Sequence, residues 1–139
     1  MARQVRDVMT VNPFSVGPDT PAHRVAVLMR DERVAAVLVT DDGRLRGLVT
    51  DRDLTVRILA AGGDVSARTV AEACGTELTS VAPEDDVDRA LLLMRAKELR
   101  RLPVIDNGRP VGIIALDDLD DGREPAPAVG GLPFGEAGL

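Results

Sequence analysis

The sequence has almost no aromatic residues and only one cysteine. Its 139 residues include no Trp, no Tyr and just two Phe, at positions 14 and 134. Aliphatic side chains must therefore fill the core, and a hydrophobic content of 45% is enough to supply it. With Cys74 as the only cysteine, the chain can form neither an internal disulfide nor a cysteine-based metal cluster. This pattern suits a reducing compartment, so we expect a cytoplasmic protein.

Long hydrophobic runs and an excess of positive charge are also missing. No stretch approaches the roughly 18 apolar residues of a membrane span, and the N-terminal MARQVRDVMT lacks the apolar centre of a signal peptide. We therefore expect no membrane association. The chain has 17 Lys and Arg against 23 Asp and Glu, which gives a formal net charge of -6. This balance argues against nucleic acid as a partner, because binding a phosphate backbone requires many cationic side chains.

Residues that commonly carry catalysis are scarce. The single histidine, His23, falls on the polar side of a predicted helix with no Asp, Glu or Cys arranged around it as metal ligands. No nucleophile elbow and no glycine-rich phosphate loop precedes a helix. The acidic pairs Asp41-Asp42 and Asp117-Asp118 fit hairpin and helix-start positions better than a metal cluster. We predict that the chain is not an enzyme, with no catalytic residue, no metal site and no required cofactor.

What the sequence does contain is an internal repeat. A shift of 65 positions, from Met29 to Met94, aligns SVGPDTPAHRVAVLMRDERVAAVLVTDDGRLRGLVTDRDL with SVAPEDDVDRALLLMRAKELRRLPVIDNGRPVGIIALDDL without a gap. An ungapped match of this length indicates one supersecondary unit that occurs twice. We place the first repeat at residues 1–63, the second at 64–121, and a Gly- and Pro-rich tail at 122–139 that favours a flexible extension.

Hydrophobic period and turn residues predict the elements of each repeat. The dipeptides Asp42-Gly43 and Asn107-Gly108 indicate tight two-residue hairpins. The segment TVAE is a capping box, which begins a short helix before the second repeat. We therefore predict an α+β (α/β-like) fold, made of two β-α-β-β-α repeats packed with pseudo-twofold symmetry, antiparallel hairpins and outer helices. The predicted helices are 20–33, 50–62, a helix from 83 and a short one from 116, and the hairpin strands are 36–40, 45–49, 102–105 and 110–114.

The doubled pattern resembles that of a known family. Each repeat has a proline-led helix with LMR, an LPVID-like strand, a DG or NG hairpin and a Gly-h-h-Thr-x-x-Asp-like ending, where h is apolar. Across residues 3–120 this resembles a tandem pair of CBS domains, the cystathionine-β-synthase type regulatory repeat or Bateman module, and especially the short stand-alone two-repeat proteins of actinobacteria. The resemblance implies a non-catalytic ligand sensor that binds AMP, ADP, ATP or S-adenosylmethionine between its repeats, and a homodimer through the repeat helices.

The resemblance also implies a main ligand site. Asp53 would accept hydrogen bonds from both ribose hydroxyls, with Thr50 beside it at the start of the same helix. Thr79 would line the adenine slot through its backbone. Arg100 and Arg101 would lie near the phosphates, since guanidinium groups match phosphate oxygens well. The main site is thus predicted at Thr50, Asp53, Thr79, Arg100 and Arg101.

A second, weaker site follows from the same resemblance. It is predicted at Phe14, Val34, Ala35 and Asp118. Here Ala115 replaces the hydroxyl of Thr50, and alanines replace the two arginines. Because a lost hydrogen bond costs about 0.5 to 1.5 kcal/mol and a lost charge-assisted one about 1.5 to 3, we expect one competent site and one weak or empty site.

Other interpretations of these residues remain open. Thr50 can be a helix N-cap and Asp53 a carboxylate that stabilises the same helix start, with no ligand. Arg100 and Arg101 can pair with surface acids instead of phosphates. The whole chain can be a structural or interaction module with a vestigial, empty cleft, whose outer helices dock an unknown protein partner. Met29 and Met94 are predicted to fill the core.

Overall fold

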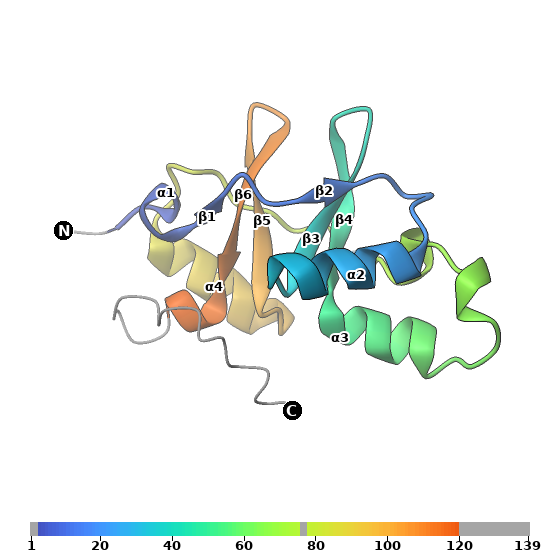
Figure 1. The fold of residues 1–139 in the computed structure, drawn as a ribbon. Helices are drawn as coiled ribbons and strands as arrows, with labels where there is room; N and C mark the ends of the chain where they lie inside the picture. The colour runs from blue at the N-terminus through green and yellow to red at the C-terminus, as the bar shows by residue number, and fades with distance from the viewer. Residues whose placement is uncertain (1–2, 76–77, 120–139) are drawn as a thin grey trace.

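The computed structural model describes residues 3–75 and 78–119, and two three-stranded sheets form its framework. Figure 1 shows the two long hairpins side by side, with both turns at the same end of the molecule. One sheet has the order β2-β3-β4 and the other the order β1-β6-β5. All pairs are antiparallel except β2 with β3. The strands of the described part are β1 (Thr10–Val11), β2 (Ser15–Val16), β3 (Ala36–Asp41), β4 (Arg44–Thr50), β5 (Arg101–Asp106) and β6 (Arg109–Ala115).

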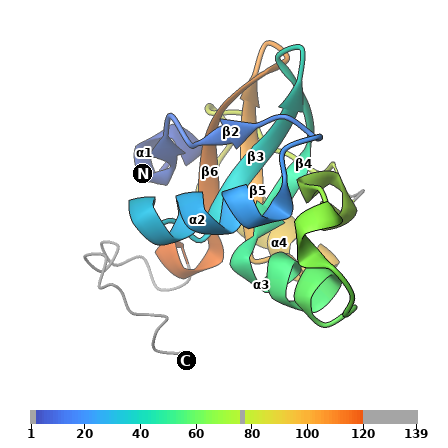
Figure 2. The ribbon, with the colours of Figure 1, turned by 45° about the vertical axis from the view of Figure 1, so that its right-hand side comes forward.

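The long helices lie at the end of the molecule opposite the hairpin turns. Figure 2 shows α2, α3 and α4 together below the strands. A mixed fold of this kind, α+β with antiparallel hairpins and helices outside them, is the predicted class, and the prediction is confirmed. The described helices are α1 (Val5–Val8), α2 (Ala22–Glu32), α3 (Asp51–Asp53), which continues as the π-helix η1 (Leu54–Leu59), the 3-10 turns η2 (Val65–Ala67) and η3 (Val70–Glu72), α4 (Val87–Lys97) and the 3-10 turn η4 (Leu116–Asp118).

Most predicted boundaries agree with the structure to within about two residues, and two differ by more. The predicted start of a helix at Pro83 is wrong, because α4 begins at Val87. Residues from Ala82 to Asp85 form a turn first, in which the Asp85 carboxylate accepts a 2.8 Å hydrogen bond from the Ala82 N–H. The helix predicted to reach Gly62 ends earlier, since its η1 part stops at Leu59. The capping box of TVAE is present, with η3 as the short helix that it begins.

The hairpin turns have the predicted backbone. Asp42 and Gly43 have φ of 54° and 77°, and Asn107 and Gly108 have φ of 51° and 80°. Positive φ at both central residues is what two-residue hairpins with a right-handed strand twist require. The two turns therefore fix the pairing next to them, Asp41 with Arg44 and Asp106 with Arg109, and a β-bulge in each hairpin then shifts the register of the remaining strand.

The segment that precedes the first half packs into the core of the second half, and the segment that precedes the second half packs into the core of the first. Val5 is fully buried in the core of the second half, and Val70 is fully buried in the core of the first. The Val5 N–H donates to the Asp85 carbonyl at 2.8 Å, and at the equivalent place the Val70 N–H donates to the Thr20 carbonyl at 2.8 Å. The chain therefore crosses between halves twice. The repeat boundaries at 1–63 and 64–121 remain a prediction, and the packing runs across them.

Two glycines allow these crossing segments to lie close to the hairpins. A Cβ at Gly112 would lie 2.7 Å from the Met9 sulfur and 2.8 Å from the Thr10 carbonyl oxygen. In the other half a Cβ at Gly47 would meet the Cys74 sulfur and lie 3.0 Å from the Gly75 oxygen. These are equivalent positions of the two repeats, so the internal symmetry extends to the backbone contacts.

The core is aliphatic, as the composition predicts. Met29 and Met94 are buried, at 7% and 0% exposure, so their assignment to the core is confirmed. No polar or charged side chain is buried among the residues that the structure describes. His23 is exposed, as predicted. The tail predicted at 122–139 lies outside the described residues.

Candidate functional site

The main candidate site is a pocket of about 470 Å³ formed by both halves. The first half contributes the end of β4 and the start of α3, and the second half contributes the start of β5 and the segment before it. All five residues of the predicted main site line this pocket. Its lining residues are Leu48, Thr50, Arg52, Asp53, Arg57, Gly75, Thr79, Glu98, Leu99, Arg100, Arg101, Leu102 and Pro103.

Thr50 and Asp53 form a capping box at the start of α3. The Thr50 N–H donates to Asp53 Oδ2 at 2.8 Å, and the Asp53 N–H donates to Thr50 Oγ1 at 3.1 Å. The interpretation of this pair as a helix cap is therefore correct. Asp53 Oδ1 is not used in the cap and lies 4.0 Å from Arg57 Nε, with 27% of the side chain exposed. Because a carboxylate accepts about four hydrogen bonds, the cap orients Asp53 and leaves acceptor capacity for a ligand.

Arg100 and Arg101 have different surroundings. Arg100 Nη2 donates to Asp117 Oδ1 at 2.9 Å, in a pair whose side chains are 66% and 79% exposed. The alternative that a surface acid pairs with Arg100 is therefore also correct. An exposed ion pair contributes about 0 to 1 kcal/mol, so a phosphate can compete for this guanidinium. Arg101 is half-buried, and its side chain forms no hydrogen bond or ion pair with another described residue, although its backbone pairs with Ala115 in the sheet.

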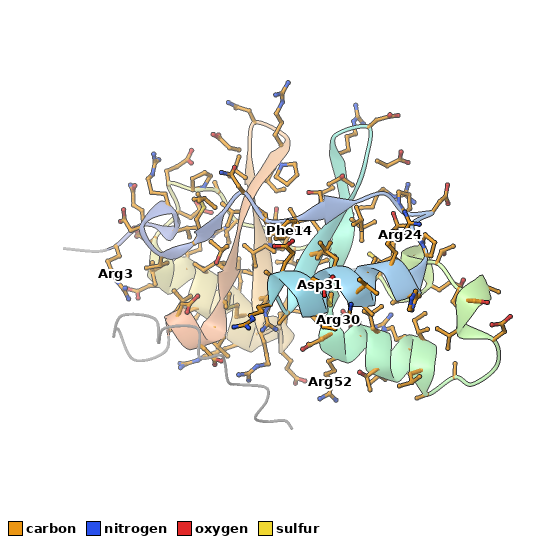
Figure 3. All side chains as sticks on the ribbon, viewed as in Figure 1. Arg3, Phe14, Arg24, Arg30, Asp31 and Arg52 are labelled. Carbon is orange, nitrogen blue, oxygen red and sulfur yellow. The ribbon has the colours of Figure 1, made fainter. Side chains whose placement is uncertain are left out.

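The sequence analysis missed two further cations of the pocket, Arg52 and Arg57. Arg52 projects from α3 at the end of the molecule opposite the hairpin turns (Figure 3). The spacing of Asp53 and Arg57, four residues apart in one helical segment, was the available signal, because such pairs meet on a helix face. With them, four arginines and two acids, Asp53 and Glu98, line the pocket. The pocket is thus cationic in a chain whose net charge is -6.

The second candidate pocket, of about 370 Å³, lies on the other side of the junction between the halves. Phe14, Val34 and Ala35 line it, and Phe14 lies between the two halves near the middle of the view (Figure 3). Asp118, the fourth predicted residue, is not among the described residues that line this pocket. Ala115 also lines it and caps η4 without a side-chain hydrogen bond. Without a hydroxyl at this position, η4 has no capping box to orient Asp118.

The two pockets are related by the internal repeat. Several residues of the second pocket are copies, 65 positions away, of residues that line the first. The second pocket also has two arginines, Arg33 and Arg101, which the sequence analysis did not assign to it. The equivalent pairs are Thr10 and Gly75, Phe14 and Thr79, Arg33 and Glu98, Val34 and Leu99, Ala35 and Arg100, Ala36 and Arg101, Ile113 and Leu48, and Ala115 and Thr50.

Asp118 provides a prediction about stability. Burial raises the pKa of its carboxyl above the ordinary 3.8, the neighbouring Asp117 raises it further, and Arg101 opposes the rise. The folded state therefore binds this proton more tightly than the unfolded state, so the carboxyl lowers stability as the pH rises from the unfolded pKa through the folded pKa. We expect Asp118→Asn to raise the melting temperature at about pH 7, and to raise it less at about pH 3.5, where Asp118 is mostly protonated in both states. Calorimetric scans of both proteins at both pH values measure this difference, and an equal or lower melting temperature for the variant at neutral pH would contradict it.

A larger pocket, of about 920 Å³, lies between the two hairpin turns. It is lined by turn residues of both hairpins, Asp42 and Gly43 with Asn107 and Gly108, and by none of the predicted site residues. Its charged lining residues are Asp42, Arg44 and Arg109, which are turn and strand-end residues of the hairpins, and Asp42 is exposed. Within residues 3–75 and 78–119, no three His, Cys, Asp or Glu side chains group so that they could hold a metal ion. No described helix has the length and hydropathy needed to cross a membrane.

Comparison with protein families gives a match over most of the chain. The model of the CBS domain matches twice, at residues 5–60 and at residues 70–122. These two ranges correspond to the two repeats found by the internal alignment. The tandem arrangement expected from the resemblance is therefore confirmed.

Individual relatives agree with this match. The CBS domain-containing protein YhcV of Bacillus subtilis is 39% identical over 115 residues, which cover 83% of this chain and 81% of YhcV. Hypoxic response protein 1 of Mycobacterium tuberculosis is 33% identical over 82% of this chain and 80% of its own length. Both comparisons span most of each protein, so the similarity is not limited to one repeat.

Solved structures show the same fold. A crystal structure of Hypoxic Response Protein I with two coordinated zinc ions superposes with a TM-score of 0.75 at 32% identity, and covers 85% of this chain and 97% of that one. A crystal structure of CBSX2 in complex with AMP superposes with a TM-score of 0.71 at 25% identity, and covers 86% of this chain and 94% of that one. One structural relative thus binds an adenine nucleotide.

Proposed function

Since the chain belongs to the CBS-domain family and carries the domain twice, we propose that it is a non-catalytic regulatory module whose main pocket binds an adenosine-containing ligand. The observation that carries the proposal is the convergence of residues from both halves on one pocket. A half-buried carboxylate, Asp53, and the two arginines at the start of β5 line the same cavity of about 470 Å³. The AMP complex of CBSX2 supports the choice of ligand class.

Each part of such a ligand has a complementary group in the pocket. Asp53 Oδ1 accepts hydrogen bonds from the ribose hydroxyls, because the capping box uses only Oδ2. The backbone of Thr79 lines the place of the adenine ring, next to the apolar side chains of Leu48 and Leu99. Arg100 and Arg101 bind the phosphates, where paired N–H donors fit two oxygens of one phosphate. Thr50 positions Asp53 through the cap.

The charge of the pocket favours nucleotides over S-adenosylmethionine. Four arginines and two acids line it, so the local charge is positive. The sulfonium group of S-adenosylmethionine carries a positive charge of its own, whereas the phosphates of AMP, ADP and ATP are negative. Because opposite charges attract most strongly where water is partly excluded, we infer a phosphate-bearing ligand of the AMP, ADP and ATP series.

A ligand panel tests this proposal. We expect AMP, ADP or ATP to raise the melting temperature by mass action, and calorimetry with the same ligand to give about one site per chain. S-adenosylmethionine should shift the melting temperature less than the nucleotides do, because the pocket repels its cation. Adenosine and NADH serve as controls for the phosphate and for a larger adenine ligand. Two equal sites per chain, or a preference for S-adenosylmethionine, would contradict the proposal.

One set of contacts favours the alternative, an interaction module with an empty cleft. The capping box and the Arg100–Asp117 pair give several pocket groups partners within the chain itself. Under this alternative, no nucleotide changes the melting temperature and the function lies on the outer helices. Exposed apolar side chains do occur there, with Leu59 at 64% and Leu92 at 72% exposure. The predicted homodimer through the repeat helices, an unknown protein partner and the cytoplasmic location all remain predictions.

A further inference from the structure

One side chain, Arg101, lines both candidate pockets. Arg101 is the first residue of β5 and lies opposite Ala115 of β6, so it stands at the junction of the two halves. Its copy in the first repeat, Ala36, lines only the second pocket. An alanine at this position cannot reach from one pocket into the other, because its side chain ends at Cβ. The internal symmetry is therefore broken at this position by a long cationic side chain.

The guanidinium of Arg101 has fewer partners within the chain than those of the neighbouring arginines. Arg100 is paired with Asp117 at 2.9 Å, and Arg57 lies 4.0 Å from Asp53. The Arg101 guanidinium forms no hydrogen bond or ion pair within the part of the chain that the structure describes. Asp118 is near enough that Arg101 lowers the pKa of its carboxyl, although no hydrogen bond or ion pair joins the two side chains. A guanidinium that makes no hydrogen bond or ion pair can turn to whichever pocket holds an anion.

The second pocket is suited to an anion for a separate reason. Its charged lining residues are Arg33 and Arg101, and no Asp or Glu is among the described residues that line it. The main pocket, by contrast, has the carboxylates of Asp53 and Glu98 beside its arginines. The second pocket thus lacks a group that would bind a ribose diol, but it has two guanidinium groups for phosphate oxygens.

We propose that Arg101 is shared between the two pockets and makes them compete for phosphate-bearing ligands. The inference rests on the proposed function, because it takes the main pocket to bind a nucleotide through its phosphates. A guanidinium that binds a phosphate in the main pocket has fewer N–H donors and less net charge to offer an anion in the second. Filling the main pocket therefore weakens the second about tenfold, and the coupling is equal in the reverse direction.

A fluorescent reporter placed in the second pocket tests this coupling. The chain has no Trp or Tyr, so Phe14→Trp introduces the only strong fluorophore, at a position that is 40% exposed and lines that pocket. Pyrophosphate is titrated into this reporter protein with the main pocket empty, with saturating adenosine, and with saturating ADP. Calorimetry on the same protein measures whether ADP binds the main pocket. We expect the pyrophosphate affinity to be about tenfold weaker with ADP than with adenosine or without ligand.

Two further variants separate coupling from other effects. In the reporter with Arg101→Gln, ADP should change the pyrophosphate affinity less than about twofold, because no side chain is shared. In the reporter with Asp53→Asn, which binds ADP poorly, the effect of ADP should also disappear. If the effect persists in the Asp53 variant, ADP competes directly in the second pocket and the proposal is overturned.

The remaining outcomes distinguish the coupling from the proposed function. If calorimetry shows ADP in the main pocket and pyrophosphate binds equally well with and without it, the proposed function stands and the coupling is refuted. Pyrophosphate that never changes the Trp fluorescence refutes the coupling as well, because the second pocket then takes no anion. If ADP gives no binding heat at all, the proposed function fails and the coupling fails with it.

Discussion

Asp53→Asn should weaken the binding of ADP about 100-fold, which corresponds to about 2.7 kcal/mol. The proposed contact is a carboxylate that accepts hydrogen bonds from two ribose hydroxyls, and charge-assisted bonds of this kind contribute about 1.5 to 3 kcal/mol each. Asparagine keeps one acceptor oxygen but loses the charge and the second acceptor. Isothermal titration calorimetry of the parent and the variant measures the change.

A matched control comes from the internal repeat. Asp118 is the copy of Asp53, so Asp118→Asn makes the same chemical change at the equivalent position. Asp118 does not line the main pocket, and we expect the ADP affinity of this variant to stay within about twofold of the parent. An equal loss in both variants, or no loss in the Asp53 variant, would show that Asp53 does not hold the ligand.

The Asp53 variant must also remain folded for its affinity to be meaningful. Asp53 Oδ2 accepts the Thr50 N–H at 2.8 Å, and the amide oxygen of an asparagine can accept the same bond. The helix cap should therefore survive, with a loss of less than about 1 kcal/mol in the free energy of unfolding. Urea unfolding followed by far-UV circular dichroism checks this, since the chain has no Trp to report on it.

Val5→Asp should lower the free energy of unfolding by about 3 to 5 kcal/mol, because it places an unpaired charge in a buried site. Val5 has 0% exposure and belongs to the core of the second half, although it lies near the beginning of the chain. For a small domain this loss is a large part of the total stability. Urea unfolding at about pH 7 measures it, as the difference between the parent and the variant.

The same segment supplies the control for Val5. Val11 lies in β1 and is 59% exposed, so Val11→Asp puts the same charge into water. We expect this variant to change the free energy of unfolding by less than about 0.5 kcal/mol. A mild effect of Val5→Asp, similar to that of Val11→Asp, would mean that the N-terminal segment is not part of the core of the second half.

The elements that the sequence predicts best are those whose signals are local. The dipeptides Asp42-Gly43 and Asn107-Gly108 predict their turns because positive φ is a property of the two residues themselves. Thr50 and Asp53 predict their cap for a similar reason, since the two side chains bond to backbone groups three residues away. The five main-site residues come from both halves of the chain. That they line one pocket could be predicted only because the repeat and the family resemblance indicated which segments of the two halves lie side by side.

Of the features that sequence analysis missed, the first has a local cause and the other two depend on long-range packing. The late start of α4 follows from a turn at Ala82 to Asp85 that competes with the helix signal of Pro83. The crossing of α1 to the second half leaves only a weak trace in the sequence, the similarity of RQVRDVM to RTVAEAC at the same shift of 65 positions. The position of Arg101 between two pockets leaves no trace in the sequence. Residues of both halves line these pockets, so the position can be seen only when the two halves are packed together.

The double crossing also constrains how the chain can fold while it is synthesised. The first half cannot close its core until residues as far as Ala73 have left the ribosome. Val5 is made before all the other residues of its core, so it must wait for Val81 to Leu119 before it has a place to pack. Since domains generally fold as units during synthesis, neither repeat is such a unit here. The two copies reach the native state only together, so a chain that carried a single copy would have to exchange its leading segment with a second molecule.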